Sequence, residues 1–154
     1  MGSDDYISHL RKYVGHQPLL MAGATVLVLN AKNEVLMLRR SDTDDWGVPG
    51  GSMELGDTVE ETARRELLEE TNLTARELEL FGVFSGPEQY FRYPNGDEVY
   101  NVSVAYIARG VQGDLTMNDG ENSDPQYFDL SHLPENISSP IRPILRKLSE
   151  SIAR

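Results

Sequence analysis

The stretch that decides the fold runs from Gly50 to Leu73 and reads GGSMELGDTVEETARRELLEETNL. Its glycines permit a turn, and the residues after the turn predict a helix over Thr58–Thr71. Thr58 and Glu61 match a capping box at the start of this helix. Asn72 tolerates the left-handed conformation that ends a helix. The stretch therefore predicts a tight turn that leads directly into a helix.

Three carboxylates near the end of this helix break the ordinary rules for helix charges. Glu66, Glu69 and Glu70 lie where the helix dipole disfavours anions, and Glu66 and Glu70 repel each other at a spacing of four residues. The three positions share one face, so their oxygens can converge on a hard divalent cation such as Mg²⁺. The alternative is a solvated acidic face that forms ion pairs with Arg64 and Arg65.

The surroundings of these carboxylates favour the metal site. Because the helix follows the glycine turn directly, a carbonyl of Gly50 or Gly51 is available as a further hard ligand. Arg65 precedes Glu69 by four residues, and we expect it to hold that carboxylate by a charge-assisted bond.

The spacing of the whole stretch resembles the signature of the Nudix hydrolase family. That signature requires glycine, five residues, glutamate, seven residues, Arg-Glu, an aliphatic residue, any residue, Glu-Glu, any residue, glycine and an aliphatic residue. The matching positions here are Gly51, Asp57, Arg65, Glu66, Leu67, Glu69, Glu70, Asn72 and Leu73. Asp57 stands where glutamate is usual, and Asn72 stands where glycine is usual. The resemblance extends from about Leu19 to Leu148.

The resemblance implies an α/β fold, namely a Nudix-type α/β/α sandwich with a mixed β-sheet between helices. It also implies a Mg²⁺ or Mn²⁺ ion held by the signature helix. Glu66 and Glu70 are the leading ligands, Glu69 is a ligand or an orienting group, and the Gly50 carbonyl is a weaker candidate.

The implied reaction is hydrolysis of a pyrophosphate bond in a nucleoside diphosphate linked to another moiety, by a water molecule that the metal activates. The catalytic candidates are Glu69, Glu66 and Arg65. The general base in this family is either a signature glutamate or an acid on a later loop, and here that loop offers Glu121 and, less favourably, Asp124.

An acidic metal site also needs cations and stacking groups for its substrate. Arg39 and Arg40 end a predicted strand before the glycine turn, and alternation directs one of them toward the pocket. The resemblance indicates Arg40. Tyr90, Phe91 and Tyr93 lie in a turn-rich stretch and are candidates for stacking on a base, with surface packing as the alternative.

The substrate itself stays open between several classes. Pro87, 14 residues after Leu73, resembles a marker of ADP-ribose pyrophosphatases, and Tyr90, 17 residues after it, resembles a marker of dinucleoside polyphosphate hydrolases. Nucleotide sugars and nucleoside triphosphates are further candidates, as is the 5′ end of RNA. The rival from another class is a non-catalytic nucleotide sensor of the same fold.

The remaining chain predicts short elements around this centre. They are a helix over 4–14, strands over 19–29 and 35–38 that pair as a hairpin, strands over 78–85, 100–108 and 126–130, and a helix over 141–152. We assign residues 1–17 to an N-terminal helical extension and 18–154 to the Nudix domain. The extension either covers the core or forms the contact of a homodimer.

Composition restricts the compartment and the partners. The chain has 154 residues, a net charge of −11 and no cysteine. The isoprenoid diphosphate isomerases of this fold need a catalytic cysteine, which disfavours that activity. No apolar run is long enough for a membrane span, so we expect a cytoplasmic protein that binds no membrane. The negative charge also disfavours binding to a nucleic acid backbone.

The negative charge is concentrated in two places. Glu54–Glu70 holds seven carboxylates and two arginines, for a net −5, and Gly113–Glu135 contributes −6 with no lysine or arginine. Bound Mg²⁺ would offset part of this charge. The acidic stretches therefore favour a phosphate substrate that is bound through the metal.

Overall fold

Three α-helices and two β-sheets make up residues 5–117 and 120–153, the part of the chain that the computed structural model describes. In chain order the elements are α1 (Tyr6–Val14), β1 (Leu19–Val28), β2 (Val35–Arg40), β3 (Trp46–Gly47), β4 (Gly50–Ser52), α2 (Val59–Thr71), β5 (Thr74–Phe84), the 3-10 helix η1 (Pro87–Gln89), β6 (Tyr90–Arg92), β7 (Glu98–Gln112), β8 (Asn122–Phe128) and α3 (Arg142–Ala153).

The larger sheet is mixed, as the sequence predicts. Its strand order is β4-β1-β7-β5, and β6 pairs with the beginning of β7. Strands β1 and β7 are parallel over the whole length of β1, whereas the other pairs are antiparallel. A second, antiparallel sheet has the order β3-β2-β8.

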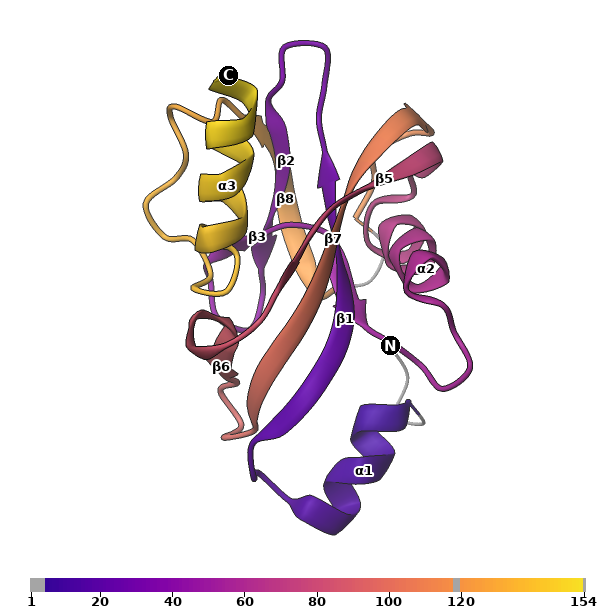
Figure 1. Ribbon diagram of the computed structural model, residues 1–154, viewed down its shortest axis with the longest axis vertical. Helices are drawn as coiled ribbons and strands as arrows, with labels where there is room; N and C mark the ends of the chain where they lie inside the picture. The colour runs from indigo at the N-terminus through magenta and orange to yellow at the C-terminus, as the bar shows by residue number, and fades with distance from the viewer. Residues whose placement is uncertain (1–4, 118–119, 154) are drawn as a thin grey trace.

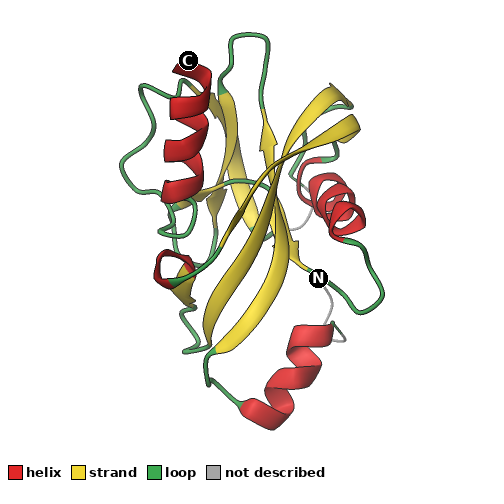
Figure 2. Ribbon diagram, viewed as in Figure 1, coloured by secondary structure: helices red, strands yellow, loops and turns green. Residues whose placement is uncertain are grey.

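Helices cover the sheets on two sides and complete the expected α/β/α sandwich (Figures 1 and 2). On the side of α2, the buried residues Ala63 and Leu67 pack against Val26 and Leu36. On the side of α3, Ile144, Leu145 and Leu148 pack against Leu27 and Met37, together with other buried apolar residues. The two helices thus fix the sheets from opposite sides, and the ends of α2 and β4 meet at the candidate site.

The predicted helix over Thr58–Thr71 is confirmed as α2. The expectation that it directly follows a glycine turn is wrong, because Gly50 and Gly51 lie in β4, paired with β1, and residues 53–58 separate β4 from α2. The Thr58 side chain accepts a hydrogen bond from the backbone N–H of Glu61, and Asn72 adopts the left-handed conformation with φ 64°. The predicted first helix is α1, which ends at Gly15, although the expected start at Asp4 lies outside the described residues. The described part of α1 contains no buried residue.

The predicted hairpin of residues 19–29 with 35–38 is wrong. Strands β1 and β2 lie in different sheets, and an isolated bridge between Leu29 and Val35 joins their ends. Strand β1 pairs instead with β4 and β7, while β2 pairs with β3 and β8. Partners distant in sequence decide this pairing, and a local turn signal carries no information about them.

The dipeptide Asn95-Gly96, a common turn sequence, lies in the hairpin that joins β6 and β7. Tyr90, Phe91 and Arg92 pair with Tyr100, Val99 and Glu98, and Gly96 takes a φ of 95°. None of the helices in the described residues is long and apolar enough to cross a membrane.

Candidate active site

Glu70 fastens the end of α2 to both sheets. It is 8% exposed. Its Oε2 accepts a hydrogen bond from the backbone N–H of Gly50 in β4 at 2.8 Å, and its Oε1 accepts one from Nδ2 of Asn122 in β8 at 3.1 Å. Gly50 therefore meets Glu70 through its N–H group, and a metal-binding role for its carbonyl stays a prediction.

Glu66 lies one turn before Glu70, directly beneath the backbone of Gly51. It is 4% exposed, and a Cβ atom at position 51 would lie 2.5 Å from Cδ of Glu66, so a side chain there would displace the carboxylate. Oε1 of Glu66 is buried and accepts no hydrogen bond among the described residues, while Nη2 of Arg65 lies 3.9 Å away. Burial, together with the charge of Glu69, raises the pKa of Glu66 to about 7.

These contacts of Glu66 fit a divalent cation. A buried carboxylate oxygen without a donor is costly unless a cation or a proton meets it. Mg²⁺ and Mn²⁺ both prefer oxygen ligands of this kind. Within residues 5–117 and 120–153, no three His, Cys, Asp or Glu side chains are gathered as a ready cation site. The fit therefore rests on the unmet oxygen of Glu66.

Arg65 pairs with Asp57 rather than with Glu69. Its Nη1 donates a hydrogen bond to Oδ2 of Asp57, and its Nη2 donates one to the carbonyl of Ser52 at 3.4 Å. Glu69 is exposed. Side chains on a helix point back toward its N-terminus, so Arg65 reaches the loop before α2 more readily than the turn after it. The shorter Asp57 thus still meets the signature arginine.

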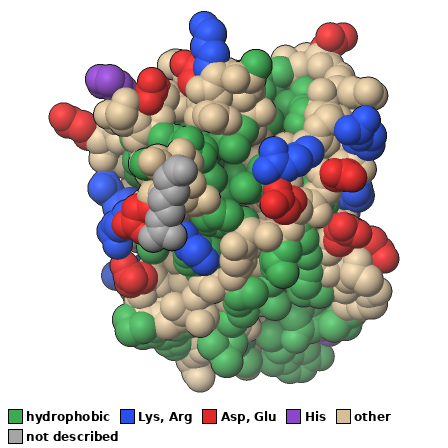
Figure 3. Space-filling model, turned by 45° about the horizontal axis from the view of Figure 1, so that its top comes forward, with side chains coloured by type: hydrophobic (Ala, Val, Ile, Leu, Met, Phe, Trp, Pro, Cys, Tyr) green, Lys and Arg blue, Asp and Glu red, His purple; other side chains and the backbone are tan. Residues whose placement is uncertain are grey.

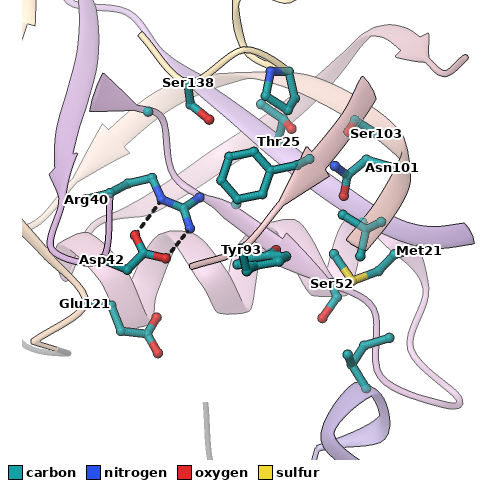
Figure 4. Close-up of a pocket in the computed structure, with 18 of the residues that line it drawn as sticks. Met21, Thr25, Arg40, Asp42, Ser52, Tyr93, Asn101, Ser103, Glu121 and Ser138 are labelled. Carbon is teal, nitrogen blue, oxygen red and sulfur yellow. Dashed lines mark hydrogen bonds and ion pairs between the residues drawn. The ribbon is translucent and has the colours of Figure 1, made fainter. Parts of the chain in front are cut away.

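A cavity of about 720 Å³ lies beside β4 and Glu70. Its walls come from α1, β1, the end of β2, β4, the β6–β7 hairpin and the loops before β8 and α3. Of the signature glutamates, Glu70 lines the cavity, whereas Glu66 and Glu69 are not among its described lining residues. The lining residues used below are Ile7, Ser8, Arg11, Arg40, Asp42, Gly50, Gly51, Glu70, Phe91, Tyr93, Asp97, Asn101, Ser103 and Glu121. Several of them point toward one another across the cavity (Figure 4).

Arg40 is a cation that faces this cavity from the end of β2. Its Nε and Nη2 donate to the two carboxylate oxygens of Asp42 at 3.0 and 2.8 Å. The guanidinium carbon lies 5.2 Å from the ring centre of Phe91 and 5.9 Å from that of Tyr93. The hydrogen bonds from Arg40 lower the pKa of Asp42 below its ordinary value. Arg40 is thus a charged, oriented donor, and its present partner is a carboxylate that a phosphate can replace.

Arg39 and Tyr90, the other predicted substrate-binding residues, are not among the described residues that line the cavity. Arg39 forms ion pairs with Asp44 at 2.9 Å and Asp124 at 3.7 Å. The hydroxyl of Tyr90 donates a hydrogen bond to Glu98. Alternation along β2 accounts for the opposite directions of Arg39 and Arg40.

Of the two candidate bases on the later loop, Glu121 lines the cavity and Asp124 does not. Glu121 lines the cavity on the side of Asp42 (Figure 4), and its backbone carbonyl accepts a hydrogen bond from the N–H of Ser41 at 2.9 Å. Asp124 is paired with Arg39 outside the cavity lining. The geometry favours Glu121 of the two.

The sequence did not predict that Asn101 and Ser103 of β7 line the cavity, nor that the buried Gln89 holds both of them. Gln89 is 1% exposed and donates through Nε2 to the carbonyl of Pro140 at 2.8 Å. Its Oε1 accepts from the Ser103 hydroxyl at 3.1 Å, and its carbonyl accepts from Nδ2 of Asn101 at 3.0 Å. The alternation of Asn101 and Ser103 along β7 is the one available signal for them, whereas Gln89 carries none.

Comparison with known proteins places the chain in a family. The NUDIX domain family matches residues 19–148. The ADP-ribose pyrophosphatase of Methanocaldococcus jannaschii is 33% identical over 111 residues, which cover 70% of this chain and 62% of that protein. The NAD-capped RNA hydrolase NudC of Vibrio atlanticus is 30% identical over 138 residues, which cover 88% of this chain and 46% of that protein.

Solved structures agree with the fold. The MutT protein of Methanosarcina mazei superimposes with a TM-score of 0.73 at 19% identity, over 90% of this chain and 99% of that one. The chain spans less than two thirds of the length of the curated relatives described above. The family match nevertheless covers most of this chain, Glu70 of the signature helix lines the cavity, and the chain belongs to the NUDIX domain family.

Proposed function

We propose that this chain is a divalent-metal-dependent hydrolase that cleaves the pyrophosphate bond of a nucleoside diphosphate linked to another moiety. The observation that carries the proposal is the buried Glu66, whose Oε1 has no donor in the described region and lies on the same helix as Glu70. Arg40 faces the adjoining cavity and supplies the cation that a phosphate group needs.

Glu66 and Glu70 would hold a Mg²⁺ or Mn²⁺ ion, with Glu69 and the Gly50 carbonyl as further candidates. When bound, the ion would neutralise phosphate oxygens and lower the pKa of a water molecule. Arg65, held by Asp57, adds positive charge beside Glu66.

Glu121 is the base that this proposal assigns to the reaction. It accepts a proton as the water oxygen attacks phosphorus, and the phosphorus–oxygen bond to the leaving phosphate breaks. Arg40 exchanges its bonds with Asp42 for bonds to the diphosphate oxygens of the bound substrate, and these bonds contribute to substrate binding. Both residues line the cavity, so both can act on one bound substrate.

ADP-ribose is the first substrate to test. The relative from Methanocaldococcus jannaschii is named for that substrate, and a structural neighbour, the NUDIX domain of Shewanella oneidensis NrtR, is described as complexed with it. Nucleotide sugars, oxidised nucleoside triphosphates and dinucleoside polyphosphates are the alternatives. The net charge of −11 disfavours the capped RNA of the NudC relatives.

The decisive experiment is a substrate panel assayed for phosphate, nucleoside monophosphate and pyrophosphate release. ADP-ribose, a nucleotide sugar, a nucleoside triphosphate and a dinucleoside tetraphosphate are each tested with Mg²⁺, with Mn²⁺ and with EDTA. We expect turnover of at least one compound that EDTA abolishes. Tight binding of a nucleotide without any turnover would establish the sensor of the same fold instead.

We also propose that the protein is a cytoplasmic homodimer, with an apolar face of the larger sheet as the interface. Leu20, Leu80, Val83 and Tyr100 are between 40% and 81% exposed, and strand register places them on one face. Figure 3 shows a broad apolar region of this kind on the surface. Because each copy carries a net charge of −11, a second copy can approach best where these four uncharged side chains lie.

A further inference from the structure

Arg11 ties helix α1 to the beginning of β7. Its Nη1 donates to the carbonyls of Gly15 and Gln17 at 2.8 and 2.6 Å, and its Nη2 donates to the carbonyl of Glu98 at 2.7 Å. Its side chain is 11% exposed, and Nε lies 3.6 Å from Oδ2 of Asp97. Since α1 buries no residue in its described part, these charge-assisted contacts help to hold it, together with the hydrogen bonds that Glu54 accepts from the N–H of Tyr6.

The partner of Arg11 sits in the turn of the β6–β7 hairpin. Asp97 also lies 2.6 Å from Nδ1 of His16 and receives a hydrogen bond from Asn95 at 3.3 Å. Burial alone would raise the pKa of Asp97, but the bond to His16 and the charge of Arg11 outweigh it and lower that pKa. The turn is therefore fastened to the N-terminal segment by a charged cluster.

The same hairpin carries the two rings that contact Arg40. Phe91 and Tyr93 meet edge to face, with ring centres 4.8 Å apart. The guanidinium of Arg40 lies against both rings, and Tyr93 points toward Arg40 (Figure 4). A displacement of the turn at Asp97 would move these rings, since only three residues separate Tyr93 from Asp97.

Helix α1 also contributes directly to the cavity wall. Ile7, Ser8 and Arg11 line the cavity together with Phe91, Tyr93 and Asp97. Gly50, Gly51 and Glu70 lie among its other lining residues. The cavity thus extends from Glu70 of α2 to the N-terminal helix.

We propose that α1 is part of the substrate site and that Arg11 is a positioning residue for it. Arg11 holds the β6–β7 turn so that Phe91 and Tyr93 keep Arg40 directed into the cavity. The inference rests on the proposed function, in which the substrate is a nucleoside diphosphate derivative. Loss of Arg11 weakens substrate binding and leaves the chemical step unchanged.

The test compares Arg11→Met, which keeps the aliphatic stem, with Lys12→Met as the matched control. Lys12 is exposed on the same helix, so its substitution removes the same charge from the same element. With the substrate that the panel identifies, we expect Arg11→Met to raise KM about tenfold and to keep kcat within about twofold. We expect Lys12→Met to match the wild type in both constants.

A second measurement needs no substrate. We expect hydrogen exchange of the backbone amides over Tyr90–Glu98 to accelerate in Arg11→Met and to stay unchanged in Lys12→Met. Asp97→Asn keeps the size of the side chain and should raise KM less than Arg11→Met does. The double variant should be no worse than Arg11→Met alone, because both changes break one tie.

Several results would overturn the inference. An unchanged KM in Arg11→Met overturns it, even if hydrogen exchange over the hairpin becomes faster. The contact between Arg11 and the β6–β7 turn would then be structural and would have no role in substrate binding. A lower kcat at constant KM, or a higher KM with unchanged exchange over the hairpin, also rules out positioning through the turn. The proposed function is judged separately on the wild-type protein, and wild-type protein that neither cleaves nor binds a nucleotide overturns both.

Discussion

At the scale of single residues, the site depends on the contact between Gly51 and Glu66. The glycine leaves room for a carboxylate that no donor in the described region satisfies at Oε1. The sequence predicted Glu66 as a ligand from its place on the helix. It could not predict the burial of this side chain, because the strand that covers it, β4, reaches this place only by pairing with β1.

We expect Glu66→Gln to abolish metal-dependent turnover without unfolding the protein. Glutamine keeps the shape of the side chain and removes the charge, so the cost of burying a carboxylate disappears while the cation loses its ligand. In thermal unfolding, Mg²⁺ should raise the midpoint of the wild type and not that of the variant. Glu61→Gln, in the first turn of α2, is the control and should respond like the wild type.

Full turnover by Glu66→Gln, or an equal Mg²⁺ shift in both proteins, would remove Glu66 from the metal site. A variant that is unfolded at room temperature would show instead that its charge is needed for folding.

The Arg40–Asp42 pair predicts a dependence of stability on pH. The hydrogen bonds from Arg40 lower the pKa of Asp42 in the folded state, so the pair stabilises the fold above the ordinary pKa of 3.8. This stabilisation is lost as the pH falls below that value and through the lowered pKa. The Asp42 side chain is 41% exposed, so we expect a small effect.

Urea unfolding of the wild type and Asp42→Asn at about pH 7 and about pH 3 measures this effect. At about pH 7 the wild type should have a larger free energy of unfolding than Asp42→Asn, and this difference should be smaller at about pH 3. A difference that is equal at both values would contradict the assigned role of the pair.

At the scale of elements, α2 illustrates how local sequence places the site. Its start at Thr58 and its end at Asn72 follow the predicted capping rules, and both caps are formed by side chain or backbone contacts close in sequence. Such contacts need no distant partner. The bounds of this helix could therefore be predicted well, whereas the pairing of β1 and β2 could not.

Asn72 should prove conformationally important. With φ 64°, it lies in the left-handed region, which glycine adopts readily, asparagine tolerates and alanine avoids. We expect Asn72→Ala to lower the unfolding free energy by about 1 kcal/mol, and Asn72→Gly to cost less. Equilibrium unfolding of the three proteins measures this. If alanine and glycine cost the same, the bond from Asn72 to the carbonyl of Asp114 matters more than the backbone conformation.

At the scale of the whole molecule, helix α2 covers only part of one face of the larger sheet. Helix α2 packs over Tyr106 and Ala108, but the same face of the sheet is bare around Tyr100 and Val83. An apolar surface of this extent on an acidic protein is typical of an interface. The sequence showed these residues as ordinary alternating strands, and only the placement of α2 leaves them exposed.

We expect Val83→Glu to convert the proposed dimer into a monomer. Val83 is 61% exposed, and two copies related by a twofold axis would bring the new carboxylates into one apolar interface. Light scattering after size exclusion measures the mass. Leu68→Glu is the control, because Leu68 is 47% exposed on α2 and does not belong to the strands of this face, so it should leave the mass unchanged. A monomeric wild type would exclude the proposed interface.

The sequence by itself determined the signature helix, its caps, its acids and the family, because these depend on residues within one short stretch of chain. The tertiary structure decided that Arg40 and Glu121 face the cavity while Arg39, Asp124 and Tyr90 do not. It also brought α1 to the cavity wall through Arg11 and Asp97, which lie 86 positions apart in the chain. Contacts of this kind arise when distant strands pair, and no local pattern of residues encodes them.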